Sequence, residues 1–143
     1  DDAAGILIRF SNGARATISI SQISSGRKNS INWEISGPNG SLGFDSENPE
    51  QLWIGHRGKA NEILHKDPGM LSESAAKAAF YPGGHVEGFS ETFRALFERV
   101  YSDIESGSRS NSYPTFADGL KSLRITEAIA SSSKAGAWIR VIN

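Results

Sequence analysis

The chain has no cysteine among its 143 residues, which excludes disulfides, thiolate catalysis and cysteine metal sites. Its three histidines, His56, His65 and His85, do not have the spacing of metal ligands. No G-x-G-x-x-G opens a strand–helix unit, no Walker A lysine motif occurs, and no G-x-S-x-G elbow supplies a nucleophile. The carboxylates are dispersed, so no acid–base pair can be assigned. The sequence therefore predicts no catalytic, cofactor-binding or metal-binding residues in this chain.

Charge and hydrophobicity exclude further classes of protein. The net charge is −1, so no bulk attraction to nucleic acid or to an anionic membrane is expected. No apolar run approaches the roughly 20 residues that cross a bilayer. The first residue is Asp1 rather than Met, from which we expect a processed or cut chain. The lack of cysteine is compatible with the cytoplasm, which is the location we predict.

The first third of the chain has the alternation of β-strands. Apolar residues occupy every second position from Ile6 to Phe10, from Ala14 to Ile20 and from Ile31 to Ile35. Asn12-Gly13 indicates a two-residue hairpin turn. Shorter strands are expected near residues 42–44 and 52–54, which together give an antiparallel meander. Residues 56–84 are interpreted as a long surface excursion with one short helix at residues 72–80, for which Ser72 is the expected N-cap.

The last third is predicted to be helical. Apolar residues recur at helical spacing from Phe89 to Ile104, and Gly107 stands where a C-terminal cap is expected. A second helix is expected to begin with Thr115 or Asp118 as its cap and to run to about residue 132, with Gly136 ending it. A final strand is predicted over residues 137–142. Strands followed by helices predict the α+β class, an open-faced, mainly antiparallel sheet with helices packed on one face.

Three features remain open between a structural and a functional interpretation. Residues 21–29 are rich in hydrogen-bond donors and are either a solvated hairpin loop or a binding site for hydroxyl groups. Residues 81–88 lie directly before the first long helix and are either a structural turn or a ligand loop in which His85, kept neutral by the helix dipole, meets a hydroxyl. The polar sheet face is either solvated or a self-association surface, and its side chains are Arg15, Thr17, Ser19, Asn32 and Glu34.

The order of several short segments resembles the C-terminal domain of the glucose–fructose oxidoreductase / inositol dehydrogenase (Gfo/Idh/MocA) family. The likeness runs through nearly the whole chain, and it is specific through order and spacing rather than through one motif. The matching segments are Phe10-Ser11-Asn12-Gly13-Ala14, Ser21-Gln22 through Gly26-Arg27-Lys28-Asn29, Glu34-Ile35-Ser36-Gly37, Gly40-Ser41-Leu42, Pro82-Gly83-Gly84-His85-Val86-Glu87-Gly88-Phe89, Tyr113-Pro114-Thr115-Phe116-Ala117-Asp118-Gly119 and Gly136-Ala137-Trp138-Ile139.

The resemblance implies one C-terminal substrate and oligomerisation domain over residues 1–143, with the N-terminal Rossmann domain, which binds NAD or NADP, absent from this chain. It implies a sugar or polyol substrate, and a homodimer or homotetramer formed through the open sheet face. His85 is the first substrate-binding candidate, followed by Arg27 and Asn29. The family's Glu-Lys-Pro and Asp-x-x-x-His segments do not occur in this sequence, so no cofactor binding and no activity are expected from this chain alone.

Two other hypotheses compete with the oxidoreductase domain. One is a stand-alone sugar-binding or scaffold module of the same fold, which the upstream reading frame would distinguish. The other is a hydrolase built on His85 and Glu87, although neither a nucleophile nor a carboxylate pair can be placed near these residues.

Overall fold

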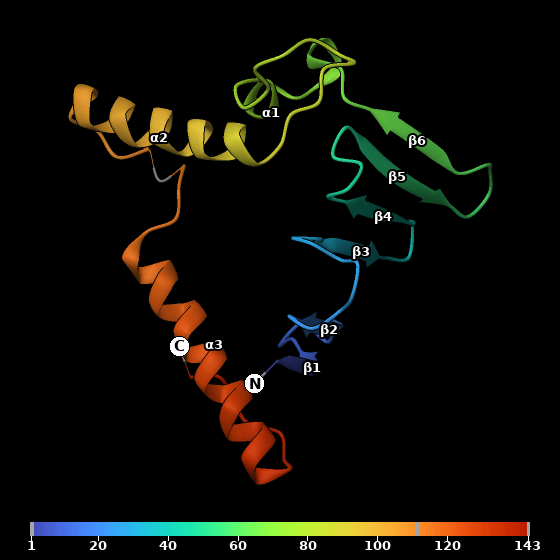
Figure 1. Ribbon diagram of the computed structural model, residues 1–143, viewed down its shortest axis with the longest axis vertical. Helices are drawn as coiled ribbons and strands as arrows, with labels where there is room; N and C mark the ends of the chain where they lie inside the picture. The colour runs from blue at the N-terminus through green and yellow to red at the C-terminus, as the bar shows by residue number, and fades with distance from the viewer. Residues whose placement is uncertain (1, 111, 143) are drawn as a thin grey trace. The chain divides into compact units, whose positions relative to one another are not determined.

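The computed structural model describes residues 2–110 and 112–142. The chain divides into two compact units, one formed by Asp1–Arg27 with Asn111–Asn143 and the other by Lys28–Ser110. Each unit combines antiparallel strands with helix, so the predicted α+β class is confirmed. Figure 1 shows the elements in chain order.

The first unit contains a β-hairpin and a long helix. Strand β1 (Ala3–Arg9) pairs antiparallel with β2 (Arg15–Ser21), and Ile6 lies opposite Ile18. The hairpin turn lies where it was predicted, but its loop has three residues rather than the expected two. The Gly13 N–H donates to the Phe10 carbonyl at 3.0 Å, and Gly13 has a φ of +90°. This φ favours glycine, since a Cβ would crowd the backbone there.

Helix α3 (Phe116–Ala135) begins and ends where its capping residues predict. Thr115 is the N-cap, and its Oγ1 accepts a hydrogen bond from the Asp118 N–H at 3.4 Å. Asp118 completes a capping box by accepting the Thr115 N–H at 3.0 Å. Gly136 ends the helix in the left-handed conformation, with a φ of 60°.

The predicted final strand is wrong. Residues 138–142 have no strand in the structure, because no neighbouring strand of the described residues supplies the ladder of hydrogen bonds that a strand requires. The segment instead packs through its aromatic side chain. The Arg9 guanidinium lies 4.2 Å from the centre of the Trp138 ring.

The second unit contains a four-stranded antiparallel meander. Its strands are β3 (Asn32–Ser36), β4 (Gly40–Asp45), β5 (Gln51–His56) and β6 (Glu62–His65), in that order across the sheet (Figure 1). The interpretation of residues 56–84 as a surface excursion missed β6. Four residues with a polar start give too short a pattern to distinguish a strand, and pairing with β5 decides the conformation.

The register of the meander separates an apolar face from a polar one. Cross-strand partners share a face, and Trp33, Phe44, Leu52 and Leu64 are partners in that order across the four strands. The rings of Trp33 and Phe44 are stacked with centroids 5.8 Å apart. These side chains define the apolar face, and Asn32 and Glu34 lie on the opposite face, as the alternation predicts.

The remaining elements of the second unit are helical. The 3₁₀ helix η1 (Pro68–Met70) precedes α1 (Glu73–Ala76), which is capped by Ser72 as predicted but is shorter than expected. Helix α2 (Phe89–Ser106) matches the apolar stripe, and its aromatic rings contact one another along one side. Gly107 ends α2 in the left-handed conformation, with a φ of 64°.

Candidate functional site

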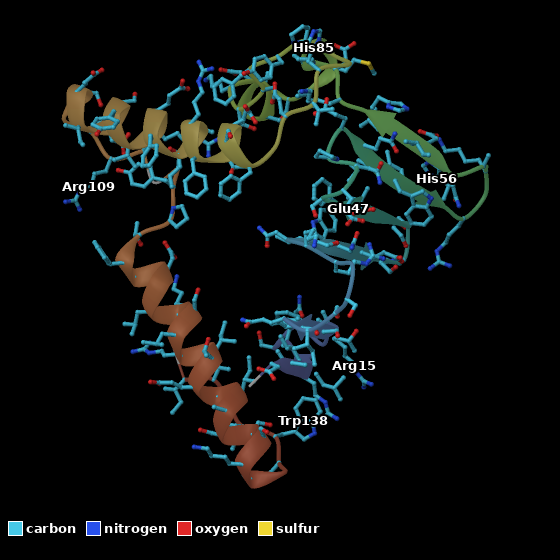
Figure 2. All side chains as sticks on the ribbon, in the orientation of Figure 1. Arg15, Glu47, His56, His85, Arg109 and Trp138 are labelled. Carbon is cyan, nitrogen blue, oxygen red and sulfur yellow. The ribbon has the colours of Figure 1, made fainter. Side chains whose placement is uncertain are left out.

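The candidate substrate loop, residues 81–88, connects α1 to the start of α2, and Figure 2 labels His85 within it. A tight turn shapes the loop, since the His85 N–H donates to the Pro82 carbonyl at 3.2 Å and Gly84 has a φ of +81°. The His85 side chain is exposed. Its Nδ1 lies 3.4 Å from the Gly83 carbonyl oxygen, a long contact in which only Nδ1 can be the donor. In the neutral imidazole, that arrangement leaves Nε2 as an acceptor for a hydroxyl.

Three charged side chains stand beneath this loop. The ammonium of Lys66 forms ion pairs with Glu50 Oε2 at 3.0 Å and with Glu87 Oε1 at 3.2 Å. The side chains of Lys66, Glu50 and Glu87 are only 14%, 16% and 10% exposed. We name these three residues the Lys66 cluster. Lys66 Nζ also donates a hydrogen bond to the His85 carbonyl oxygen at 3.1 Å, which links the cluster to the candidate residue itself.

The β5–β6 register explains why Glu50 and Lys66 meet. Gln51 pairs with His65 at the end of the ladder, and the Lys66 N–H continues it by donating to the Glu50 carbonyl at 2.8 Å. Alternation along the two strands therefore places Glu50 and Lys66 on the apolar face of the meander. The loop is attached at this side of the sheet.

Backbone hydrogen bonds reinforce the ion pairs. Glu50 Oε1 accepts the Glu87 N–H at 2.9 Å, and Glu87 Oε1 accepts the N–H of Tyr81. Burial alone would raise the pKa of Glu87, but the Tyr81 N–H and the Lys66 ammonium outweigh it and hold that pKa below its ordinary value. Burial likewise opposes the charge of Lys66, yet Glu50 and Glu87 raise its pKa above the ordinary value. Lys66 and Glu87 are thus ionised near neutral pH.

Helix α2 holds the other side of the loop. Phe80 is the residue directly before the loop, and the Arg94 guanidinium of α2 lies 4.1 Å from the centre of its ring. Glu91 accepts a hydrogen bond from the Gly88 N–H at 2.9 Å, which satisfies a donor at the helix start. The loop is therefore fixed at both ends, and its central residues remain exposed.

The other two candidates lie outside this loop. Arg27 belongs to the first unit, where its N–H closes a turn on the Ser24 carbonyl at 3.3 Å and Gly26 has a φ of +81°. Asn29 is an exposed residue of the second unit, in the segment that leads to β3. The three candidates therefore do not form one described cluster, and their substrate contacts stay predictions.

Sequence analysis missed Lys66 and Glu50. Residues 50, 66 and 87 are far apart in the chain, and no motif connects them. Their meeting depends on β6, which the sequence pattern did not reveal. Glu87 was named within the matching segment at residues 82–89 and in the hydrolase hypothesis, and the structure shows it ion-paired with Lys66.

A second feature lies on the polar face of the meander. An open pocket of about 470 Å³ is lined in part by Trp53. Its ring lies against two glycines, since a Cβ built on Gly43 would stand 3.3 Å from the indole and one on Gly55 only 2.5 Å from it. An aromatic ring lying flat among amides and carboxylates suits contact with another surface. The other lining residues are Asn32, Trp33, Glu34, Phe44, Asp45, Asn48, Gln51 and Ile63.

Some kinds of site do not occur in the part of the chain that the structure describes. No group of three His, Asp or Glu side chains is arranged to hold a metal ion. The paired strands within residues 2–110 and 112–142 are all antiparallel, so these residues offer no βαβ unit of the kind that binds a dinucleotide. No helix over the same residues is long and apolar enough to cross a membrane.

The architecture is that of an α+β protein. The meander of its second unit has the 81–88 loop on the side of its apolar face and the Trp53 pocket on its polar face. Residues 1–141 match the model described as the oxidoreductase family, C-terminal alpha/beta domain. The chain therefore belongs to the Gfo/Idh/MocA oxidoreductase family, as the resemblance implied.

Known proteins resemble the chain over nearly its whole length. Levoglucosan dehydrogenase of Pseudarthrobacter phenanthrenivorans is 28% identical, over 99% of this chain and 36% of its own length. An oxidoreductase from Sinorhizobium meliloti has a TM-score of 0.91 at 28% identity, covering 98% of this chain and 41% of that protein. An Azotobacter vinelandii inositol dehydrogenase homologue was solved with NADH and myo-inositol. It has a TM-score of 0.82 at 25% identity, and the match covers 97% of this chain and 39% of that protein. The chain thus spans well under half the length of these relatives.

Proposed function

We propose that this chain is the substrate-binding and oligomerisation domain of a longer NAD-dependent oxidoreductase that acts on a sugar or polyol. The observation that carries the proposal is the 81–88 loop, which the Lys66 cluster holds so that His85 stays exposed with Nε2 as a hydroxyl acceptor. A sugar or polyol presents the hydroxyls that such an acceptor meets. Two relatives support this substrate class, since one is a levoglucosan dehydrogenase and the other was solved with myo-inositol.

The cofactor proposal rests on the relatives rather than on residues of this chain. The inositol dehydrogenase homologue was solved with NADH and also with NAD⁺, which favours NAD over NADP. We propose that the nucleotide binds to another part of the longer protein, which would supply hydride transfer. The proposed role of this chain is to bind and orient the hydroxylated substrate. The absence of cysteine fits our proposal of a cytoplasmic location.

Steady-state kinetics of the longer protein test the role of His85. We expect NAD-dependent oxidation of one member of a panel of sugars and polyols, followed by NADH absorbance. His85→Ala should raise KM about three- to tenfold, because one hydrogen bond to a hydroxyl is lost. His65→Ala is the matched control, since His65 is exposed and lies on the other face of the meander. An unchanged KM in His85→Ala would remove His85 from the site.

The 143-residue chain alone separates this proposal from a stand-alone module. We expect it to bind no NADH and to show no NAD-dependent activity. Micromolar binding of NADH by the isolated chain would overturn the domain assignment. Micromolar binding of a sugar by the isolated chain, in a gene that encodes no nucleotide-binding domain, would favour the sugar-binding module.

We further propose that the polar face of the meander binds a second copy of the chain to give a homodimer or homotetramer. Trp53 would be the anchor, since it is a large aromatic ring that lines a pocket on that face. Sedimentation of the longer protein tests this proposal. Trp53→Ala and Glu34→Arg should each weaken self-association at least tenfold, and Lys59→Ala should not. A wild-type protein that stays monomeric at all concentrations would contradict the proposal.

A further inference from the structure

Lys66 connects three separate points of the second unit through one ammonium group. Its Nζ lies 3.0 Å from Glu50 Oε2, 3.2 Å from Glu87 Oε1 and 3.1 Å from the His85 carbonyl oxygen. The contacts with Glu50 and Glu87 are ion pairs, and the contact with His85 is a hydrogen bond. The three partners come from the strand edge, the end of the loop and the middle of the loop.

The loop lies too close to the strand edge to be a loosely tethered segment. A Cβ built on Gly83 would stand 3.2 Å from the Lys66 carbonyl oxygen, so a larger residue would crowd the backbone there. The Glu87 N–H reaches Glu50 Oε1 at 2.9 Å on the same side. Side chains of the strand edge therefore hold the loop, and the strand backbone approaches it closely at Gly83.

The contact with His85 is through its backbone, which leaves the imidazole available. Because Lys66 holds the His85 carbonyl, rotation of the peptide that follows His85 is limited. The peptide that precedes His85 is limited as well, since the His85 N–H donates to the Pro82 carbonyl. The position of Cα, from which the imidazole extends, is thereby set. Catalytic and binding groups need placement to within a fraction of an ångström, and supporting contacts of this kind provide it.

We propose that Lys66 is a positioning residue, whose ammonium holds the carbonyl of His85 so that the imidazole meets a substrate hydroxyl. This inference rests on the proposed function for its substrate part and on the loop contacts for its structural part. Lys66 acts through His85 and does not itself touch substrate. Glu50 and Glu87 keep the ammonium in place.

A purely structural ion pair would behave differently. Its loss would lower stability, and any effect on KM would be independent of His85. A positioning residue loses its effect on KM once the residue that it positions has been removed. A double-mutant cycle between Lys66 and His85 therefore separates the two roles.

The first measurement uses NMR of the 143-residue chain. Lys66→Met removes the donor to His85 and keeps an unbranched side chain of similar length. We expect the His85 carbonyl carbon to shift and the Glu87 amide to exchange with solvent at least tenfold faster. Lys59→Met is the matched control, because Lys59 pairs with Glu62 at 2.5 Å in the same unit and has no described contact with the loop. Unchanged signals in Lys66→Met would overturn the proposal.

The second measurement uses KM and kcat of the longer protein. Lys66→Met should raise KM about three- to tenfold with kcat within about twofold, because one positioned hydrogen bond is weakened. In a His85→Ala background, the same change should alter KM by less than twofold. Additive effects of the two substitutions would show a structural role only and would overturn the proposal.

Glu87→Gln covers the case in which Lys66→Met does not fold. It removes one charge from the cluster and keeps an oxygen for the Tyr81 N–H. We expect a smaller rise in KM of about twofold to threefold, again absent in the His85→Ala background. A longer wild-type protein that oxidises no sugar or polyol would sink the proposed function alone, and the NMR result would still decide whether Lys66 holds the loop.

Discussion

The indole of Trp53 lies against Gly55 so closely that a Cβ on Gly55 would stand 2.5 Å from its Cη2 atom. The two residues are two apart on β5, so both face the same side of the meander. Glycine at position 55 therefore lets the ring lie flat on the sheet. The pocket on the polar face depends on this arrangement.

Gly55→Ala should lift the Trp53 ring and lower the free energy of unfolding by about 1–3 kcal/mol, as overpacking does. Thermal unfolding and the fluorescence of the chain measure the two effects. Gly43→Ala is the milder comparison, since its Cβ would stand 3.3 Å from the indole. If Gly55→Ala were as stable as Gly43→Ala, the flat position of the ring would be wrong.

Gly40→Ala should destabilise the unit more than Gly55→Ala. A Cβ on Gly40 would stand 2.6 Å from the backbone oxygen of Gly55, which cannot rotate away as the end of a side chain can. The β4–β5 ladder would have to shift, with loss of its hydrogen bonds. Amide exchange of β4 and β5 measures this loss, and β1 and β2 serve as the internal reference.

The Lys66 cluster should lose its hold on the loop at both extremes of pH. The pKa of Glu87 is lowered, so its contribution is present above the ordinary value of 4.5 and is lost as the pH falls through the lower folded pKa. The pKa of Lys66 is raised, so its contribution is present below 10.5 and is lost as the pH rises through the higher folded pKa. The NMR shift of the His85 carbonyl carbon, followed against pH, measures both the acid transition of Glu87 (the acid limb) and the alkaline transition of Lys66 (the alkaline limb).

Glu87→Gln provides the control for the acid limb, because the amide does not titrate there. Its His85 carbonyl shift should no longer show the Glu87 transition below pH 4.5, and the alkaline limb should remain. An unchanged acid limb in Glu87→Gln would assign that transition to another carboxyl group.

The capping box of α3 should make the start of that helix sensitive to acid. Hydrogen bonds from the Thr115 N–H and hydroxyl lower the pKa of Asp118 to about 2 from 3.8, so its contribution is present above 3.8 and is lost as the pH falls through about 2. Circular dichroism against pH should show a loss of helix there, which Asp118→Asn removes. Thr115→Ala should cost about 1 kcal/mol at neutral pH, the usual cost of a lost N-cap.

Arg9 and Arg15 are direct cross-strand partners in the hairpin, and like charges in such a pair repel each other. Arg15→Thr should therefore stabilise the first unit, by about 0.2–0.5 kcal/mol. Arg9→Thr should gain less, since it also loses the contact of its guanidinium with the Trp138 ring at 4.2 Å. Chemical denaturation of the two variants measures the difference, and a greater gain in Arg9→Thr would contradict this account.

Local signals in the sequence predicted several elements well. The Asn12-Gly13 turn, the Ser72 and Thr115 N-caps, and the glycines that end the two long helices all stand where they were expected. These signals succeed because a turn or a cap satisfies its hydrogen bonds among residues that are neighbours in the chain. The family likeness was visible for the same reason, as a series of short segments in a recognisable order.

The failures concern contacts between distant residues. Strand β6 was missed because its pairing with β5 decides its conformation, and the final strand was wrong because residues 138–142 find no strand partner among the described residues. His85 was identified as a candidate from its neighbours, but the ion pairs that hold its loop were not.

The sequence by itself determined the α+β class, the helix ends, the alternation of the strands and the family, because these depend on neighbours along the chain. Only the tertiary structure brought Glu50, Lys66 and Glu87 together beneath the loop and laid Trp53 over its glycines. The physical reason is strand register. A shift of one residue between β5 and β6 would turn each side chain to the other face, and no local pattern fixes that register.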